Sequence, residues 1–295
     1  MTETVSWEKL KKKAAILGFD AAGVVPLEKL PEEGGRLGRW LEAGYQAGMN
    51  YMERNVEKRV DAALLVENAR SVIVTLTNYY STDRQPAGIP RIARYAYGKD
   101  YHIVIRERLR RLQGEMGGRC FVDSAPVFEH EWARRAGLGW IGKNTLLLHR
   151  ELGSFCFIGV IITPALFDHY SLPLEKSYCG TCTRCIDACP TGALSEHCVD
   201  ARRCISYQTI ENRGEFPEEL KKRAGGRIFG CDICQEVCPW NRKVQPHQVP
   251  EFIPHPGAMG LTAEQWRNLG EADFMELFKD TPLERTGLEK IKRNL

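Results

Sequence analysis

Two short groups of cysteines have the residue type and spacing that bind metal–sulfur clusters. The first, CGTCTRCIDACP, begins at Cys179 and follows the pattern C-x2-C-x2-C-x3-C, with proline after the last cysteine. Bacterial ferredoxins use this spacing: three thiolates hold one 4Fe–4S cluster, and the fourth cysteine ligates a second cluster. The first group therefore predicts two iron–sulfur clusters, with Cys189 crossing to the second one.

The second group, CDICQEVCPW, is one cysteine short of the same pattern and also ends in Cys-Pro. By the crossing rule, its last cysteine completes the first cluster. The first cluster is thus predicted to have the ligands Cys179, Cys182, Cys185 and Cys238. The second is predicted to have Cys189, Cys231 and Cys234. Its fourth ligand stays open at this point, because Cys198 and Cys204 both lie between the groups and spacing does not decide between them.

A zinc site is the alternative for these residues. Two C-x2-C pairs can bind one zinc ion tetrahedrally, here through Cys179, Cys182, Cys231 and Cys234. Zinc would leave the other three cysteines of the two groups without a role and would not explain the two Cys-Pro endings, so we favour clusters. Cys120 and Cys156 lie in apolar segments and are predicted to be small buried residues.

The composition is that of a soluble globular protein in a reducing compartment. Of 295 residues, 43% are hydrophobic and 27% are charged, and no apolar run is long enough to span a membrane. The first twenty residues fit an amphipathic helix and lack the layout of a signal peptide. We therefore expect a cytoplasmic protein without a membrane partner, in which the presence of eleven cysteines points to metal binding rather than to disulfides. The net charge of +3 neither indicates nor excludes a nucleic-acid partner.

The chain divides into three predicted parts: 1–170, 171–245 and 246–295. The first alternates helices and strands, which favours a mixed α+β fold, a sheet with flanking helices. Its predicted elements are a strand within 68–80, a helix over 101–113, a strand over 119–126, a helix ending at Gly137 and a hairpin over 144–163. The second part is rich in cysteine and poor in apolar runs, so we expect metal to hold it. The third is proline-rich, then weakly helical, and is expected to pack on the core.

Asp123 ends an apolar segment in FVDSAPVFEHEW and has two interpretations. An aspartate near serine and proline is most often a turn residue or a helix N-cap. Alternatively, apolar neighbours close over its carboxyl group and raise its pKa, so that it can deliver a proton. Nearby, the glycine-rich stretch AGLGWIGKN is not a Walker loop, and no GxGxxG motif supports a nicotinamide site.

Taken together, these motifs resemble the epoxyqueuosine reductase family, the cobalamin-dependent iron–sulfur enzymes of tRNA queuosine synthesis. The resemblance covers almost the whole chain, and the glycine-rich block with its preceding Val-Asp is more specific than the cysteines. The matching blocks are AGMNYMERNVEKRVDA, RIARYAYGKDYHIVIRERL, VDSAPVFEHEWARRAGLGWIGKN, CGTCTRCIDACPTGAL, ARRCISYQTIE and GGRIFGCDICQEVCPWN.

The resemblance implies roles for individual residues. The second cluster would take the cysteine of the RCIS block, Cys204, as its fourth ligand. Cobalamin would bind base-off above a nitroreductase-like α/β core in the first part, beside a ferredoxin-like module. Asp123 would be the proton donor and would also lie at the corrin. The other residues expected to line the corrin are Arg59, Ala93, Leu147, Ile158, Ile161 and Ser206. The exposed basic stretch Lys221, Lys222, Arg223 and Arg227 is the candidate tRNA contact.

The expected reaction is a two-electron deoxygenation of epoxyqueuosine in the wobble position of tRNA, giving an alkene and water. Electrons would come from an external donor of the flavodoxin or ferredoxin type, and the protein is expected to be a monomer. The rival interpretations are a reductive dehalogenase-like corrinoid enzyme, an electron-transfer ferredoxin with an added domain, and a zinc-ribbon nucleic-acid binder. The pairing of VDSAP with WIGKN argues against the dehalogenase.

Overall fold

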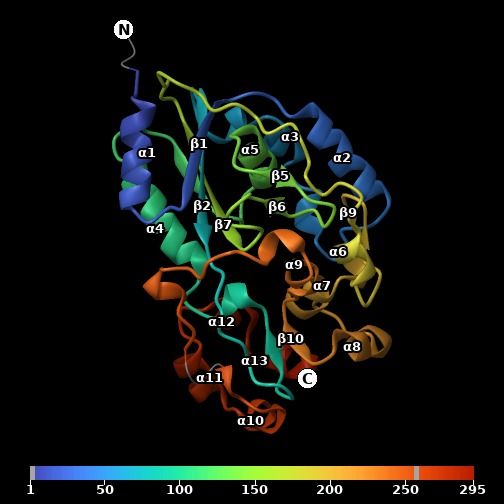
Figure 1. The fold of residues 1–295 in the computed structure, drawn as a ribbon. Coiled ribbons are helices and arrows are strands. Elements are labelled where there is room, and N and C mark those ends of the chain that lie inside the picture. Colours follow the sequence, from blue (N-terminus) through green and yellow to red (C-terminus); the bar gives the residue numbers. More distant parts are fainter. Residues whose placement is uncertain (1–3, 256–258) are drawn as a thin grey trace.

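The computed structural model describes residues 4–255 and 259–295 and confirms the predicted mixed α+β class (Figure 1). The strands are β1 (Ala21–Pro26), β2 (Ser71–Asn78), β3 (Arg91–Ile92), β4 (Arg119–Phe121), β5 (Trp140–Ile141), β6 (Leu147–Leu148), β7 (Cys156–Thr163), β8 (Leu194–Ser195), β9 (Cys198–Val199) and β10 (Arg227–Phe229). The α-helices are α1 (Trp7–Ile16), α2 (Pro31–Glu42), α3 (Val56–Val60), α4 (Tyr101–Gln113), α5 (Glu129–Arg135), α6 (Arg184–Asp187), α7 (Ile205–Ile210), α8 (Glu218–Ala224), α9 (Ile233–Glu236), α10 (Ala263–Asn268), α11 (Glu271–Leu277), α12 (Pro282–Thr286) and α13 (Leu288–Asn294). Short 3-10 helices span Asn50–Met52, Ala62–Leu65, Arg94–Ala96, Ala201–Arg203, Pro239–Asn241 and Pro250–Phe252.

An antiparallel sheet in the order β1-β2-β7-β4 forms the centre of the first part. Every residue of β2 is buried, which fits its run of β-branched residues and confirms the strand predicted within 68–80. Ile73 of β2 pairs with Ile161 of β7 in the middle of the sheet.

Helices cover both faces of this sheet. On one face, α1 and α4 pack over a core that includes Leu109 and Ile161, and on the other, α5 packs over a core that includes Trp132. The helix predicted over 101–113 is confirmed to the residue as α4; it begins where the Asp100 side chain caps the backbone N–H of His102. Its close approach to β7 needs Gly159, where a Cβ would lie 3.0 Å from Leu109.

The hairpin predicted over 144–163 is wrong. Only a single bridge, between His149 and Gly153, links the two segments; β6 pairs instead with β5, and β7 lies between β2 and β4. One edge of β7 pairs with β2 along its whole length, and the other pairs with β4 over Val160–Ile162. The strand predicted over 119–126 is also shorter, because β4 ends at Phe121.

The end of the chain builds a separate core around the parallel pair β3 and β10 (Figure 1). Ile92 and Phe229 of these strands contact Trp266, Phe274 and Phe278 of the last helical segment. A capping box of Thr262 and Gln265 begins α10. One strand each from the first and second predicted parts thus meets the helices of the third.

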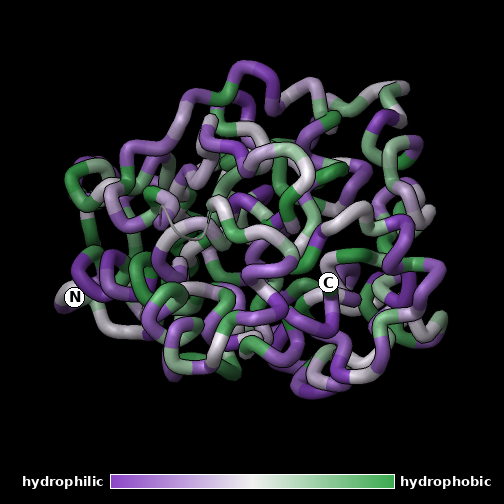
Figure 2. The backbone as a smooth tube through the Cα atoms, turned by 90° about the horizontal axis from the view of Figure 1, so that it is seen from below, coloured by the Kyte–Doolittle hydropathy of each residue, from purple (hydrophilic) through white to green (hydrophobic). Residues whose placement is uncertain are grey.

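Hydrophobic and hydrophilic residues alternate along the backbone in short stretches (Figure 2). Within residues 4–255 and 259–295, no helix is both long and apolar enough to cross a membrane.

We expect Leu109→Ala to destabilise the protein by about 2–5 kcal/mol, because it leaves a cavity between α4 and β7. Leu64→Ala is the matched control, since the Leu64 side chain is 56% exposed and its removal should change stability by less than about 0.5 kcal/mol. Anaerobic urea unfolding measures both. Equal losses in the two variants would contradict the assigned packing of α4.

Candidate functional site

The four cysteines predicted for the first cluster line one hollow of about 550 Å³. Cys179 and Cys182 come from the loop before α6, Cys185 lies on α6, and Cys238 follows α9. The short helices α6 and α9 pack against each other, which places the two cysteine groups side by side although they are distant in sequence. Crossing of Cys238 to the first group is what the spacing predicted.

The four residues predicted for the second cluster also lie near one another. The thiol of Cys204 interacts electrostatically with the thiols of Cys231 and Cys234, and the thiol of Cys189 interacts in the same way with that of Cys204. Burial raises the pKa of Cys231 to about 12 and also raises the pKa of Cys204. Cys185 is an electrostatic neighbour of Cys234 as well, so the two sets adjoin.

Cys198 and the two isolated cysteines lie on strands. Cys198 is in β9 and pairs with Ser195 of β8. Cys120 and Cys156 are half-buried in β4 and β7, and burial raises the pKa of both thiols, which is in line with the predicted role of small packed residues.

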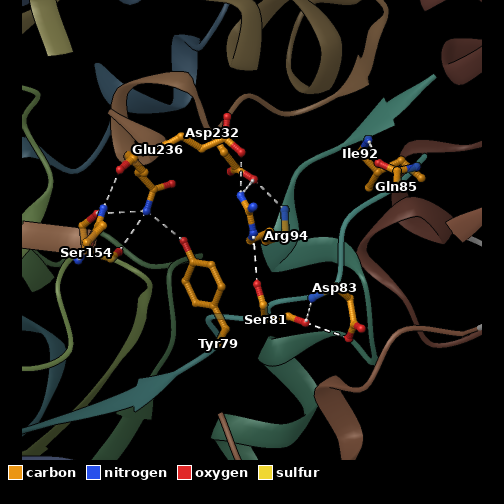
Figure 3. Close-up of polar contacts among 11 residues, drawn as sticks. Tyr79, Ser81, Asp83, Gln85, Ile92, Arg94, Ser154, Asp232 and Glu236 are labelled. Atoms are coloured by element: carbon orange, nitrogen blue, oxygen red, sulfur yellow. Dashed lines mark hydrogen bonds and ion pairs between the residues drawn. The ribbon is translucent and has the colours of Figure 1, made fainter. Parts of the chain in front are cut away.

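A buried arginine ties the second cysteine group to the rest of the fold (Figure 3). Arg94 is 5% exposed; its Nη1 donates to Glu236 at 2.8 Å and lies 3.6 Å from Asp232 Oδ2. Its backbone N–H donates to the same Asp232 oxygen at 2.8 Å, and its Nε donates to the Ser81 carbonyl at 3.3 Å. Burial nevertheless raises the pKa of Asp232 to about 6, although hydrogen bonding and the Arg94 charge lower it.

Gln235 makes a second attachment from the same helix (Figure 3). Its Nε2 donates to the Tyr79 hydroxyl at 3.1 Å and to the Ser154 carbonyl at 3.0 Å, and both partners lie at ends of central strands. Asn241 adds bonds to Ser154 at 2.9 Å and to the Gln235 carbonyl at 2.7 Å. Helix α9 is therefore fixed to the sheet on both sides of Cys234.

Asp123 lies just after β4, and its side chain is 67% exposed. Its φ of +57° is in the left-handed region, which turns the side chain out of line with the strand. The predicted closure of apolar neighbours is therefore not what the structure shows: Phe121 and Val122 are buried, but the carboxyl group points into solvent.

The Asp123 carboxylate is held by two residues from the first turn of α4. The Tyr101 hydroxyl donates to Oδ2 at 2.5 Å, and His102 Nε2 lies 3.6 Å from the same oxygen. The other ring nitrogen, His102 Nδ1, lies 2.9 Å from Asp100 Oδ1, and Arg285 Nε lies 2.8 Å from Asp100 Oδ2. A chain of polar contacts thus runs from α12 to Asp123.

Several buried polar atoms near Asp123 have no hydrogen-bond partner among the described residues: Arg59 Nε, His102 Nε2 and Glu129 Oε1. Asp123 and Arg59 both act electrostatically on Glu129, so these groups are neighbours. Protein atoms surround the Glu129 carboxyl group, and this burial raises its pKa to about 8. Unpartnered buried polar atoms are rare in proteins, and here they fit a ligand that brings its own polar groups.

The residues predicted to line a corrin are only partly brought together. Leu147 and Ile158 share the sheet face covered by α5. Ile161 is fully buried on the opposite face, against α1 and α4. Ala93 precedes the 3-10 helix of Arg94, and Ser206 is half-buried on α7, two residues after Cys204.

Most of the predicted tRNA-contacting residues are engaged within the protein. Lys221 Nζ donates to the Arg293 carbonyl at 2.8 Å, Arg223 pairs with Glu219 at 2.6 Å, and Arg227 donates to the Ala224 carbonyl at 2.9 Å. Lys222 is exposed on α8.

Sequence analysis missed Tyr51, Tyr101, His102 and Glu129 as site residues. Tyr101 and His102 lie in a segment that was predicted to be helical, and neither residue was given a role. The signal that could have identified them is a pair of polar residues in the first turn of an amphipathic helix. Tyr51 and Glu129 gave no such signal, since their proximity to Asp123 arises from the fold.

Tyr95 connects the surroundings of Asp123 with the second cysteine set. Its ring packs edge-on against Tyr101, with ring centroids 6.1 Å apart, and lies 5.8 Å from the ring of Phe229, two residues before Cys231. The second set is therefore the one that faces the candidate active site.

Comparison with protein families identifies two segments. Residues 178–241 match the family described as 4Fe-4S double cluster binding domain, and residues 59–124 match the one described as epoxyqueuosine reductase QueG, DUF1730. The first match supports iron–sulfur clusters over the zinc alternative.

Similar proteins cover nearly the whole chain. Epoxyqueuosine reductase of Leadbetterella byssophila is 46% identical over 98% of this chain and 96% of its own length, and that of Pseudomonas aeruginosa is 41% identical over 98% and 83%. Among solved structures, an epoxyqueuosine reductase in complex with an epoxyqueuosine-modified tRNA-Tyr stem loop has a TM-score of 0.90 at 31% identity, over 97% of this chain and 79% of that one. A Bacillus subtilis epoxyqueuosine reductase whose catalytic aspartate loop is swung out of the active site has a TM-score of 0.88 at 31% identity, over the same shares of the two chains.

We expect Arg94→Met to destabilise the protein by about 3–5 kcal/mol and to lower its iron content, because Asp232 and Glu236 lose their buried cation. Asp232→Asn added to this variant should recover part of the loss, since it removes one uncompensated charge. Arg202→Met, which breaks an exposed pair with Asp200, is the control and should leave both properties nearly unchanged. Urea unfolding and iron analysis test this; a double variant less stable than Arg94→Met would contradict it.

Proposed function

The chain belongs to the epoxyqueuosine reductase family, and we propose that it reduces epoxyqueuosine in the wobble position of tRNA to queuosine. The observation that carries the proposal is the exposed Asp123 carboxyl, hydrogen-bonded by Tyr101 and surrounded by buried polar atoms without partners. The reaction takes up two electrons and two protons, breaks both C–O bonds of the epoxide, and releases an alkene and water. A relative of known structure was solved with an epoxyqueuosine-modified tRNA stem loop, which supports tRNA as the substrate.

For the iron–sulfur clusters we propose the two ligand sets predicted from the sequence. The shared hollow supports Cys179, Cys182, Cys185 and Cys238 for the first cluster. Electrostatic proximity supports Cys189, Cys204, Cys231 and Cys234 for the second. The second cluster then faces the active site, and the first lies farther along the path of the electrons.

For cobalamin we propose Arg59, Ala93, Leu147, Ile158 and Ser206 as contacts, with Asp123 at its edge. The unpartnered Arg59 Nε and the half-buried apolar surface of Ile158 fit a large, flat ligand that carries amide groups. Ile161 lies on the opposite face of the sheet, where its packing would support β7. When bound, cobalamin supplies the low-potential electrons that the cleavage of a C–O bond requires.

The residues around Asp123 manage the proton. Asp100 fixes the His102 tautomer with hydrogen on Nδ1, so that Nε2 faces the Asp123 carboxyl and can exchange a proton with it. The Tyr101 hydroxyl orients the carboxyl group. Substrate binding would exclude water from this exposed carboxyl group, so that it can act as the proton donor to the epoxide oxygen. The swung-out loop of the Bacillus subtilis relative supports a loop that closes on the substrate.

The remaining predictions complete the proposal. Electrons arrive one at a time from an external donor of the flavodoxin or ferredoxin type. We propose a cytoplasmic monomer. Lys222 and Arg223 are the exposed residues of the predicted tRNA patch, and of these two only Arg223 has a described side-chain contact, its ion pair with Glu219.

Cys204→Ser should lower the iron content toward that of one cluster, whereas Cys198→Ser should leave it near two. Both residues lie between the cysteine groups, so the second variant is a matched control. Iron and sulfide analysis of anaerobically prepared protein measures the difference. Full iron in the Cys204 variant with loss in the Cys198 variant would reverse the assignment.

Asp123→Asn should lose turnover by about 10²–10⁴-fold, since an amide cannot deliver the proton that lets the epoxide oxygen leave. The variant should fold, load its clusters and bind the tRNA stem loop. Asp273→Asn, on the exposed side of α11, is the control. Single-turnover reduction of the modified stem loop measures the effect, and near-full activity of the Asp123 variant would make Asp123 a turn residue.

A further inference from the structure

The hollow at the first cysteine set is strongly basic. Of its fourteen described lining residues, five are lysine or arginine and none is aspartate or glutamate. The five are Lys143, Arg150, Arg184, Arg242 and Lys243. The whole chain has a net charge of only +3, which is less than the five positive charges that line this hollow.

Four of these cations are free to meet a partner. Lys143 is buried and pairs with Glu196 at 3.3 Å, so it is part of the structure. Arg150, Arg184, Arg242 and Lys243 are exposed. Within residues 4–255 and 259–295, no ion pair joins any of these four to a carboxylate.

Two aromatic residues, Tyr178 and Trp240, line the hollow, and the buried Trp140 packs against both. Trp140 packs edge-on against Trp240, with ring centroids 4.8 Å apart, and against Tyr178 at 5.1 Å. Arg150 hydrogen-bonds the Tyr178 hydroxyl and lies over its ring. An apolar centre within a charged rim is the usual anatomy of a transient protein interface.

The first cysteine set, which lines this hollow, is the one farther from Asp123 and therefore forms the outer end of the electron path. The second set adjoins Tyr95 and the surroundings of Asp123, while Cys234 of that set neighbours Cys185 of the first. An electron that enters at the first cluster therefore reaches the active site through the second.

We propose that the basic rim of this hollow, which surrounds the first cluster, is the docking surface for a small acidic electron-transfer protein, of the flavodoxin or ferredoxin class. This inference rests on the proposed function, because it names the surface that receives its electrons. In each of two encounters per turnover the reduced donor is oxidised by one electron and the first cluster is reduced by one. The two electrons then combine with two protons to release the epoxide oxygen as water. RNA is the less favoured occupant, since the nucleoside must reach Asp123 beside the second set.

The test uses the double variant Arg242→Glu/Lys243→Glu in the cluster-loaded protein, with reduced flavodoxin as the probe. We expect its dissociation constant for flavodoxin to rise by about tenfold or more at low salt, because rim charges steer association. The wild-type affinity should fall as salt rises, and the variant should show a shallower slope. Lys9→Glu/Lys11→Glu, on the exposed face of α1, is the matched control with the same charge change and should bind like the wild type.

Two further measurements distinguish a loss of flavodoxin docking from a loss of the clusters or of RNA binding. Iron content and cluster bleaching by reduced methyl viologen, a small cation, should be the same in both variants. Binding of the tRNA stem loop should also be unchanged. The proposal is overturned if flavodoxin binding is equal in the two variants, or if the Arg242/Lys243 variant loses stem-loop binding instead. Neither measurement requires turnover, so failure of the docking surface and failure of the proposed reaction are distinguishable.

Discussion

The buried ion pair between Arg94 and Asp232 is the interaction on which the arrangement of the clusters depends. The cysteine-rich part has few apolar residues of its own, and its small core of Ile205, Phe216 and Ala224 includes a single residue of α9, Ile233, so polar contacts must help to fix the direction of this helix. Arg94 does so, because it comes from the first part of the chain and holds Asp232 through both its backbone and its side chain. Since Asp232 lies between Cys231 and Cys234, this contact positions two of the cysteines that we propose for the second cluster.

Such a pair stabilises the fold only while both charges are satisfied. A buried ion pair often contributes no more to stability than a well-packed apolar contact. Removing one partner is nevertheless strongly destabilising, because it leaves a buried charge with neither a partner nor water. The pair also fixes the orientation of α9. An apolar contact would allow this helix to rotate, whereas the hydrogen bond and the ion pair from Arg94 to Asp232 do not. Gln235 adds uncharged bonds on the other side of the helix and completes the constraint.

The sequence predicted what depends on local spacing. The cysteine spacing predicted that Cys179, Cys182, Cys185 and Cys238 would lie together, and the periodicity of residues 101–113 predicted α4 with its bounds. The hairpin failed, because the pairing of β7 is decided by β2 and β4, which are distant in sequence. Likewise, the exposure of Asp123 depends on one positive φ, and its contacts with Tyr101 and His102 depend on how α4 approaches the end of β4. Neither is encoded in the local pattern of apolar residues.

The contact of Arg285 with Asp100 has a consequence for biosynthesis. Chains fold from the N-terminus as they leave the ribosome, so the sheet and α4 can form early. Asp100 contacts His102 within the first turn of α4, but it gains its pairing with Arg285 only once α12 has been made, and Asn294 of α13 bonds to the carbonyls of Thr209 and Ile228 later still. The chain of contacts that leads from α12 to Asp123 is thus complete only when almost the entire polypeptide has emerged.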